Sequence, residues 1–518
     1  MELLNKIGLK SYVIFFLAFC YLILPSDAFA QFDSARWEIE VGALYSNEEV
    51  LPFYLHSNVG GVYDYNFNGG YTRGRLSNQF LNTKKSVFNY GLEVYILDQA
   101  PLVNFQQAYL EYNRGPITLM GGLQEIRQTE MENISVGNFG ITNNARPFPK
   151  VGIFIHDYWK MPILNGFVSV KGEFFHGWLE KDRYIENPWL HGKSLYIKLG
   201  SNKFSFAGGL NHYAIWAGTH ASSGEDLPDG WNDYWKVITG TGLSDVSGGE
   251  ANGLGNHLGY WEFIAAVKIG NAKLELISQT PFEDGKSSQF LSVDGKSKRL
   301  WGLRLNLDKK PFLGIQKISM DYFESTWQGG PGLPDEVPEG VNNYGYPFGG
   351  RDDNYNNYLY RDGWTNDDRI IGNPLFIDRA LGEFYFDEFR DYGVAIINNR
   401  IKAFHLGLEG SVKSFDFKLM ATFSKNYGTY SGLYEGRFKW EGIQTNPNFE
   451  YIFKDALMQN YFLLELKNRP FKRNQNIDII LKFALDSGEI TDNLGIHAGF
   501  TYSGLISKAA KKAKLIKN

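Results

Sequence analysis

The chain has 518 residues, of which 16% are aromatic and 57 are glycine, and its formal net charge at pH 7 is -5. This mild charge excludes the extended basic surface of a nucleic-acid-binding protein, so no nucleic-acid partner is expected. The single cysteine, Cys20, lies in the amino-terminal segment, which excludes disulfides, zinc thiolates and cysteine nucleophiles from the mature chain.

Residues 1–30 predict a secretory signal peptide. Two lysines precede an apolar run over residues 12–24, and small residues suit cleavage after Ala30. An uncleaved anchor helix is the alternative, but the run is short for one and Pro25 ends it. The bulky Phe19 before Cys20 argues against a lipoprotein. We therefore expect an exported protein with a cleaved signal.

Alternating apolar and polar residues predict strands along the rest of the chain. The clearest unit is the hairpin at Gly270-Asn271, because this pair tolerates the positive φ angles of a tight turn between two alternating runs. Seventeen strands are expected, near residues 37–45, 87–97, 105–112, 117–124, 151–158, 167–175, 194–200, 204–210, 261–269, 272–278, 300–307, 317–323, 402–410, 415–424, 461–467, 477–485 and 494–503.

One face of each predicted strand is apolar and the other carries charged or polar side chains. Such strands need lipid on one side and water on the other, and the high aromatic content suits the girdles of a membrane barrel. Short links alternate with long ones, as periplasmic turns alternate with outer loops in bacterial barrels. The long links are 125–150, 211–260, 324–401 and 425–460.

We predict an all-β fold over residues 31–504, a transmembrane antiparallel β-barrel of about 18 strands with long extracellular loops. Because strand numbers in such barrels are even, one more strand is expected between residues 46 and 86, a gap that could also hold periplasmic helices. A soluble repeat protein such as a propeller is the alternative, but no fixed period recurs. Residues 505–518 form a basic tail, either solvated or in contact with headgroups or a periplasmic partner.

Seven segments outside the strand cores stand in one order between about residues 137 and 430. They are 140–147, 176–180 with Asp182 and Arg183, 208–213 with Trp216, 279–285, 351–357, 371–375 and 424–430. Together they resemble the Wzi-type capsule-assembly family of outer-membrane proteins.

This resemblance implies an eighteen-stranded barrel in the outer membrane of a Gram-negative cell. It implies a lectin-like attachment point for capsular or other surface polysaccharide. The partners to expect are that polysaccharide, outer-membrane lipids and, as an open alternative, the polysaccharide export machinery. A monomer is expected.

The long outer loops hold the residues expected to bind sugar. Aromatic rings stack on the apolar C–H faces of sugars, while amide, carboxylate and guanidinium groups hold the hydroxyls. Alternatively, the aromatic residues pack the loops into a plug or form the outer girdle, and the arginine at 146 pairs with a carboxylate of the barrel wall. The candidates are Trp216, Trp231, Trp235, Trp327, Tyr355, Tyr358, Arg361, Trp364 and Arg146.

Charge narrows the choice of ligand. Between Gly329 and Asn373, eight acidic residues stand against three basic ones, which favours a neutral or zwitterionic glycan or a calcium-assisted contact. Asp352, Asn354 and Asn356 are spaced like the start of a calcium loop, but the turn glycine and the bidentate carboxylate of such a loop are missing.

The histidines of the outer region are expected to be ordinary polar loop residues. No pair among them has the helix spacing of a metal site. We therefore predict no metal and no cofactor. These residues are His176, His191, His212, His220 and His257.

Enzyme signatures are missing. Three Gly-Lys-Ser triplets lack the leading glycine of a phosphate loop, and neither a Gly-x-Ser-x-Gly nor a His-Glu-x-x-His motif occurs. Glu180 and Asp182 could serve glycoside hydrolysis, but surface salt bridging explains them better. We predict a non-enzymatic barrel that binds and anchors polysaccharide. One alternative is a channel lined by residues such as Glu409, Asp416 and Glu465. A less favoured alternative is an outer-membrane hydrolase.

Overall fold

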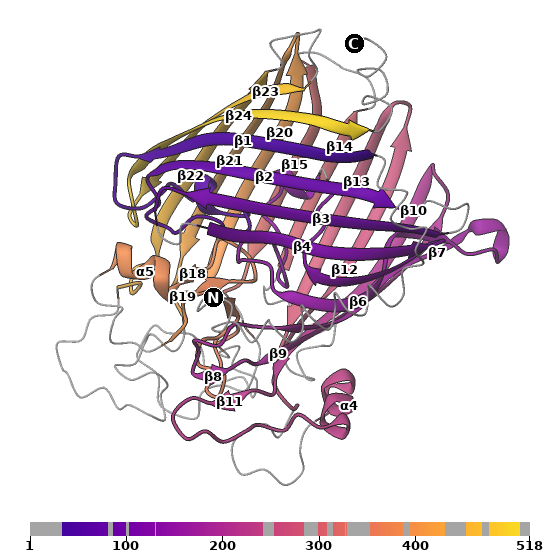
Figure 1. Cartoon of the computed structure of the whole chain (residues 1–518), viewed down its shortest axis with the longest axis vertical. Coiled ribbons are helices and arrows are strands. Elements are labelled where there is room, and N and C mark those ends of the chain that lie inside the picture. Colours follow the sequence, from indigo (N-terminus) through magenta and orange to yellow (C-terminus); the bar gives the residue numbers. More distant parts are fainter. Residues whose placement is uncertain are drawn as a thin grey trace, which may run out of the picture.

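Eighteen antiparallel strands form one sheet that closes on itself, since the first strand pairs with both the second and the last (Figure 1). The computed structural model describes residues 34–80, 86–99, 103–129, 131–241, 253–283, 299–307, 314–326, 328, 353–386, 394–429, 452–468 and 476–507. The barrel strands are β1 (Ser34–Ser46), β2 (Gly69–Phe80), β3 (Ser86–Leu97), β4 (Val103–Arg114), β5 (Ile117–Leu123), β6 (Pro149–Lys160), β7 (Val168–Trp178), β9 (Trp189–Gly200), β10 (Phe204–Trp216), β12 (Asn256–Ile269), β13 (Ala272–Phe282), β14 (Arg299–Leu307), β15 (Ile315–Glu324), β20 (Ile401–Val412), β21 (Phe415–Asn426), β22 (Leu457–Asn468), β23 (Ile477–Gly488) and β24 (Asn493–Ser507).

Closure depends on the ladder between β1 and β24, which runs along the whole of β1. A lipid bilayer offers no water to unpaired backbone N–H and C=O groups, so a spanning sheet must close. Among the helices in the described part of the chain, none is long and apolar enough to cross a membrane. The predicted all-β, eighteen-stranded barrel is confirmed.

The links differ between the two ends of the barrel. At one end they are short, as at residues 270–271, where Gly270 has the positive φ of 58° that the predicted hairpin requires. At the other end lie longer segments, whose described residues are 47–68, 124–129, 131–148, 217–241, 253–255, 325–326, 328, 353–386 and 394–400. Following the rule for bacterial barrels, we call this the outer end. The strands extend further than expected, so the loops are shorter than predicted.

The eighteenth strand, expected between residues 46 and 86, is β2. The same gap holds the short helix α3 (Phe53–His56), whose four residues are all buried. The backbone N–H of Phe53 donates to Asp486 at 2.8 Å, two residues before the outer end of β23. This helix therefore lies at the outer end, and the expectation of periplasmic helices in the gap is wrong for the described residues.

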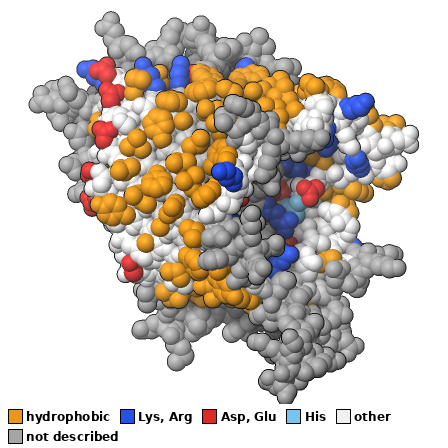
Figure 2. All heavy atoms as spheres, turned by 90° about the horizontal axis from the view of Figure 1, so that it is seen from above, with side chains coloured by type: hydrophobic (Ala, Val, Ile, Leu, Met, Phe, Trp, Pro, Cys, Tyr) orange, Lys and Arg blue, Asp and Glu red, His pale blue; other side chains and the backbone are white. Residues whose placement is uncertain are grey.

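The outward face of the wall is apolar. Along β1, Ile39 and Val41 are exposed while Glu40 between them is buried toward the lumen, which is the alternation that a lipid-facing strand requires. Seen from above, hydrophobic side chains cover a broad part of the surface, and charged side chains gather in a hollow beside them (Figure 2).

The inward face changes character along the barrel axis. Toward the inner end, charged side chains form ion pairs across neighbouring strands. Each charge is stabilised there by its partner of opposite sign and by water. Toward the outer end, the inward side chains are largely aromatic. The pairs toward the inner end include Lys317–Glu409 (2.6 Å), Lys482–Glu465 (3.4 Å) and Lys467–Asp478 (2.9 Å). Arg73–Glu40 (3.1 Å) lies midway along β1.

The outer half of the interior is filled by the outer segments. Many of their buried side chains form a large apolar cluster with the aromatic residues of the wall, and others form two smaller clusters. In the large cluster, Phe139 stacks on Phe323 of β15 (4.6 Å between ring centroids), and Phe53 stacks on Tyr461 of β22 (4.3 Å). The smaller elements of these segments are η2 (Glu132–Ile134), β8 (Ile185–Glu186), β11 (Thr219–His220), α4 (Trp231–Thr239), β16 (Thr365–Asn366), β17 (Arg369–Ile370), β18 (Ile377–Asp378), α5 (Arg379–Tyr385) and β19 (Ile396–Asn398); η3 (Leu164–Gly166) lies in an inner turn.

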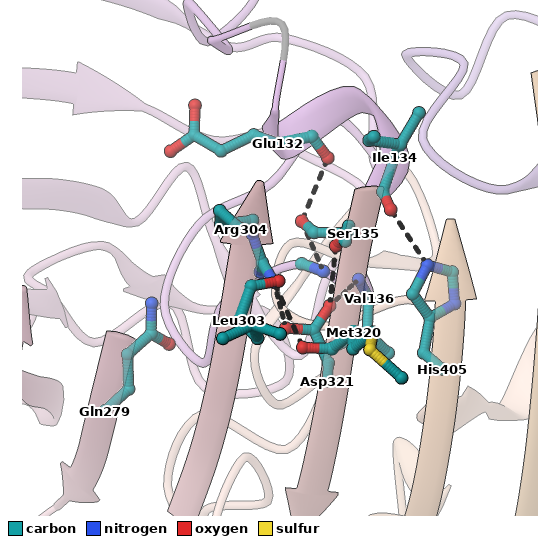
Figure 3. A network of polar contacts seen from close by, with 12 residues as sticks. Glu132, Ile134, Ser135, Val136, Gln279, Leu303, Arg304, Met320, Asp321 and His405 are labelled. Carbon is teal, nitrogen blue, oxygen red and sulfur yellow. Dashed lines mark hydrogen bonds and ion pairs between the residues drawn. The ribbon is translucent and has the colours of Figure 1, made fainter. Parts of the chain in front are cut away.

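Polar bonds attach the segment around η2 to the wall (Figure 3). Asp321 of β15 accepts the backbone N–H of Val136 at 3.1 Å and pairs with Arg304 of β14 at 2.6 Å. His405 of β20 lies 3.0 Å from the carbonyl oxygen of Ile134. These polar contacts join the segment to the wall and fix the depth at which it enters the barrel.

Candidate functional site

Three of the candidate aromatic residues are buried. Trp364 donates its indole N–H to the carbonyl of Gly140 at 3.0 Å, and Tyr355 donates its hydroxyl to the carbonyl of Phe139 at 2.9 Å. Trp216 is buried in a separate apolar cluster under α4. Because each ring is enclosed by protein, these three residues pack the outer segments together.

Four further candidates are accessible. Trp231 and Trp235 of α4 are 87% and 65% exposed. Tyr358 and Arg361, in the segment before β16, are partly exposed. Trp327 lies outside the described residues. The described candidates therefore do not form one site.

Arg361 instead meets a residue that the sequence did not single out, Tyr184. The guanidinium lies 4.3 Å from the centre of the Tyr184 ring, a cation–π arrangement. The ring of His220 meets Tyr184 edge-on at 4.7 Å, and the backbone N–H of Tyr184 donates to Asp362 at 2.8 Å. We call the following residues the Tyr184 patch: Arg146, Glu180, Arg183, Tyr184, His220, Tyr358, Arg361, Asp362, Asp367 and Asp368.

A buried arginine supports this patch. Arg183 donates to Glu180 at 2.6 Å and to the carbonyl oxygens of Thr365 and Gly363 at 2.7 and 3.2 Å. These bonds join the link before β9 to the segment that carries Tyr358 and Arg361, so two stretches far apart in sequence present one surface. Glu180 thus forms a salt bridge as expected, but its partner is buried and the pair does not lie at the surface as predicted.

The acidic groups of the patch lie near one another. Burial raises the pKa of Asp368, and the nearby Asp362 and Asp367 raise it further. Burial likewise raises the pKa of Glu180, which Arg183 opposes. Arg146 pairs with Asp367 at 3.4 Å, so its partner belongs to an outer segment and the expected carboxylate of the wall is wrong. The result is a mixed surface of rings, carboxylates and guanidinium groups.

The histidines differ from the sequence expectation. His176, His191, His212 and His257 lie in the barrel strands β7, β9, β10 and β12, and only His220 of the five lies outside them. His212 and His257 are in direct contact, with 2.9 Å between ring nitrogens. Within the described residues, no group of three or more metal-binding side chains has the geometry of a metal site.

The calcium-like spacing around residue 354 serves protein contacts in the described part of the loop. Asn356 both donates to and accepts from the backbone of Ile396, at 2.8 and 2.9 Å. Asp353 accepts from Asn399 at 2.7 Å. These side chains are therefore directed at the protein backbone and at one another.

The sequence interpretation missed Tyr184 because it lies in the short link 179–188, which was not counted among the long loops. A signal was present, since this residue directly follows the segment 176–183 that carries part of the family resemblance. Asp362 and Asp367 were noted only as charges. Their convergence on the tyrosine depends on contacts between distant segments.

The structure defines a class of protein, an outer-membrane type of β-barrel whose outer end is packed with its own loop segments. Within that class, the chain belongs to the family of the capsule assembly protein Wzi, whose model matches residues 27–311, more than half of its length. The resemblance inferred from the sequence is thereby confirmed.

Among solved structures, the chain is similar to Wzi of Escherichia coli, an outer-membrane protein involved in group 1 capsule assembly and described as a carbohydrate-binding β-barrel. The two share 10% identity over 92% of this chain and 85% of that one, with a TM-score of 0.54. OccAB2 of Acinetobacter baumannii matches with 9% identity over 92% of this chain and 98% of that one, at a TM-score of 0.46. A comparison with curated proteins finds no match.

Proposed function

We propose that this barrel binds and anchors capsular or other surface polysaccharide at the outer face of the outer membrane, without catalysing a reaction. The observation that carries the proposal is membership of the capsule-assembly family over residues 27–311. The likeness in fold to a barrel described as carbohydrate-binding supports it.

The Tyr184 patch is the surface best suited to sugar. A pyranose ring stacks on an accessible aromatic face, and its hydroxyls bond to carboxylate and guanidinium groups beside that face. Tyr184, Arg361 and Asp362 supply these three chemistries within direct contact of one another. Each contact is weak, so affinity grows when repeated units of one polymer engage neighbouring copies of the barrel.

The charges of the patch favour a neutral or zwitterionic glycan. Arg183 is engaged by Glu180 and Arg146 by Asp367. Asp362 and Asp368 add negative charge near Arg361, so a strongly anionic polymer would meet repulsion. In this proposal Trp216, Tyr355 and Trp364 act by holding the outer segments in place. Trp327 remains a candidate for direct contact.

The interior supports anchoring over an open channel. Described parts of the outer segments pack against the inward faces of β15, β20 and β22 and bury their apolar side chains there. In the inner half, Glu409 and Glu465, which were candidate pore-lining residues, are paired with lysines. Such contacts oppose free passage of solute along these walls.

The test combines cells and purified protein. The double variant Tyr184→Ala/Arg361→Ala should weaken binding of the cell's own purified polysaccharide by about tenfold, equal to about 1.4 kcal/mol, while the barrel still inserts. Lys181→Ala, a change at a neighbouring exposed cation, should bind like the unchanged protein. Polysaccharide retained normally by cells that lack the gene would refute anchoring. Normal binding by the double variant would refute the Tyr184 patch as the site.

A further inference from the structure

Helix α4 packs on the membrane-facing side of the barrel wall. On β9, Leu195 is exposed to the outside, and His191, four residues away, lies on the same face because strand side chains alternate. Tyr234 of α4 contacts that histidine, with 3.3 Å between its hydroxyl and Nδ1, and stacks on Trp216. The helix thus covers the outward face of the wall, outside the lumen.

Contacts with β7 and with a second residue of β9 also place α4 on the outward face of the wall. On β7, His176 is two residues from the exposed Phe174 and also contacts Tyr234. Lys193, on the outward face of β9, donates to the carbonyl of Ile238. In Figure 1, α4 lies at the bottom of the view, far from α5.

The height of α4 on the wall follows from strand geometry. The apolar band of such a barrel is about 25 Å tall, and a strand that rises about 3.3 Å per residue at a tilt of about 40° crosses it in about ten residues. Counted from Ile269 beside the inner turn, the band ends near Gly259. His257 therefore lies close to the outer boundary between lipid and water. Its Nε2 is 2.9 Å from the carbonyl oxygen of Leu254, which packs in one cluster with Val237 of α4, so α4 lies near the same height.

The exposed face of α4 carries Trp231 and Trp235. They are four residues apart, so they lie on one face of the helix, opposite the buried Val237. Tryptophan is enriched where apolar lipid meets water, because its ring is apolar and its N–H needs a polar partner. We propose that α4 is a membrane-interface helix whose Trp231 and Trp235 enter the headgroup region of the outer leaflet. The occupant of this face is lipid and not polysaccharide.

Spin labels at single cysteines test the depth of the helix. Starting from Cys20→Ser, which leaves no thiol in the chain, the variants Trp231→Cys and Trp235→Cys are labelled in lipid nanodiscs. Leu195→Cys on the lipid-facing wall and Asp367→Cys on the Tyr184 patch serve as matched controls. Access of the labels to oxygen, which partitions into lipid, is compared with access to a water-soluble nickel complex.

The oxygen-to-nickel ratio at positions 231 and 235 should exceed that at 367 by about threefold and approach that at 195. A ratio equal to that at position 367 would place the helix in water and overturn the proposal. So would a loss of nickel access at 231 and 235 that occurs only when polysaccharide is added. The outcome does not depend on glycan binding at the Tyr184 patch, since the lipid measurement requires no sugar.

Discussion

The interior of the barrel has two halves with opposite chemistry. In the outer half, Phe323 and Tyr461 of the wall pack against rings from the outer segments. In the inner half, Glu465 lies between Lys418 and Lys482 of the neighbouring strands, at 3.9 and 3.4 Å. The outer half is held by apolar burial, and the inner half by ion pairs beside water.

Single strands show how one pattern serves both halves. On β15, the inward positions run from Lys317 at the inner end, through Asp321, to Phe323 near the outer end. On β22 they run from Glu465 to Tyr461. The period of two sets which side chains face inward, and their type changes where water gives way to the packed segments. The outer surface therefore rests on an apolar core inside a membrane barrel, and the proposed glycan binding would depend on that core.

The largest effect is expected in the outer half. Trp364→Ala removes a fully buried ring and its bond to Gly140, which should cost about 3–5 kcal/mol of the packing of the outer segments. Because the barrel strands do not need this ring, the segments should open while the wall persists. Limited proteolysis of the inserted protein should show much faster cleavage outside, and ion conductance should rise.

Trp235→Ala is the matched control for that change, since it removes the same side chain from an exposed position. It should leave the ion conductance unchanged, because the ring lies outside the lumen. Equal sensitivity of the two variants would contradict the distinction between a packed outer core and an exposed α4 face.

An intermediate effect is expected where the halves meet. Asp321→Asn keeps an acceptor for the N–H of Val136 but leaves the buried Arg304 without its charge partner, at a cost of about 1–3 kcal/mol. Adding Arg304→Met should recover part of the loss, because a pair replaced as a whole costs less than a pair broken. Urea unfolding of the unchanged protein, the two single variants and the double variant measures the coupling energy between Asp321 and Arg304. If the double variant lost the sum of the two single losses, the coupling would be absent.

The sequence predicted the wall better than its contents. Seventeen strands were placed because their outward residues are apolar, whereas β2 was not placed because Thr72 and Gly74 occupy outward positions. The packed outer half depends on bonds such as that between Thr142 and Ile371, at 2.8 Å, which join segments more than two hundred residues apart. No local period encodes such a pairing.

The lack of a local signal also explains why the sequence did not distinguish the buried candidate residues from the exposed ones. A tryptophan that packs loops and a tryptophan that faces the surroundings have the same local sequence signature, so Trp364 and Trp231 were grouped together. Only the burial of each side chain distinguishes them. Tyr184 was missed because its partners, Arg361 and Asp362, come from a segment much later in the chain.

The smallest effect is expected in the inner half. Glu465→Gln removes one negative charge between Lys418 and Lys482, but all three side chains are partly accessible to water. The cost should be below about 1 kcal/mol and should shrink further at high salt, since water and ions screen partly exposed pairs. Urea unfolding at low and high ionic strength measures the loss of stability and its dependence on salt. A loss as large as that of Trp364→Ala would mean that the ion pairs are dry and that the two halves do not differ as described.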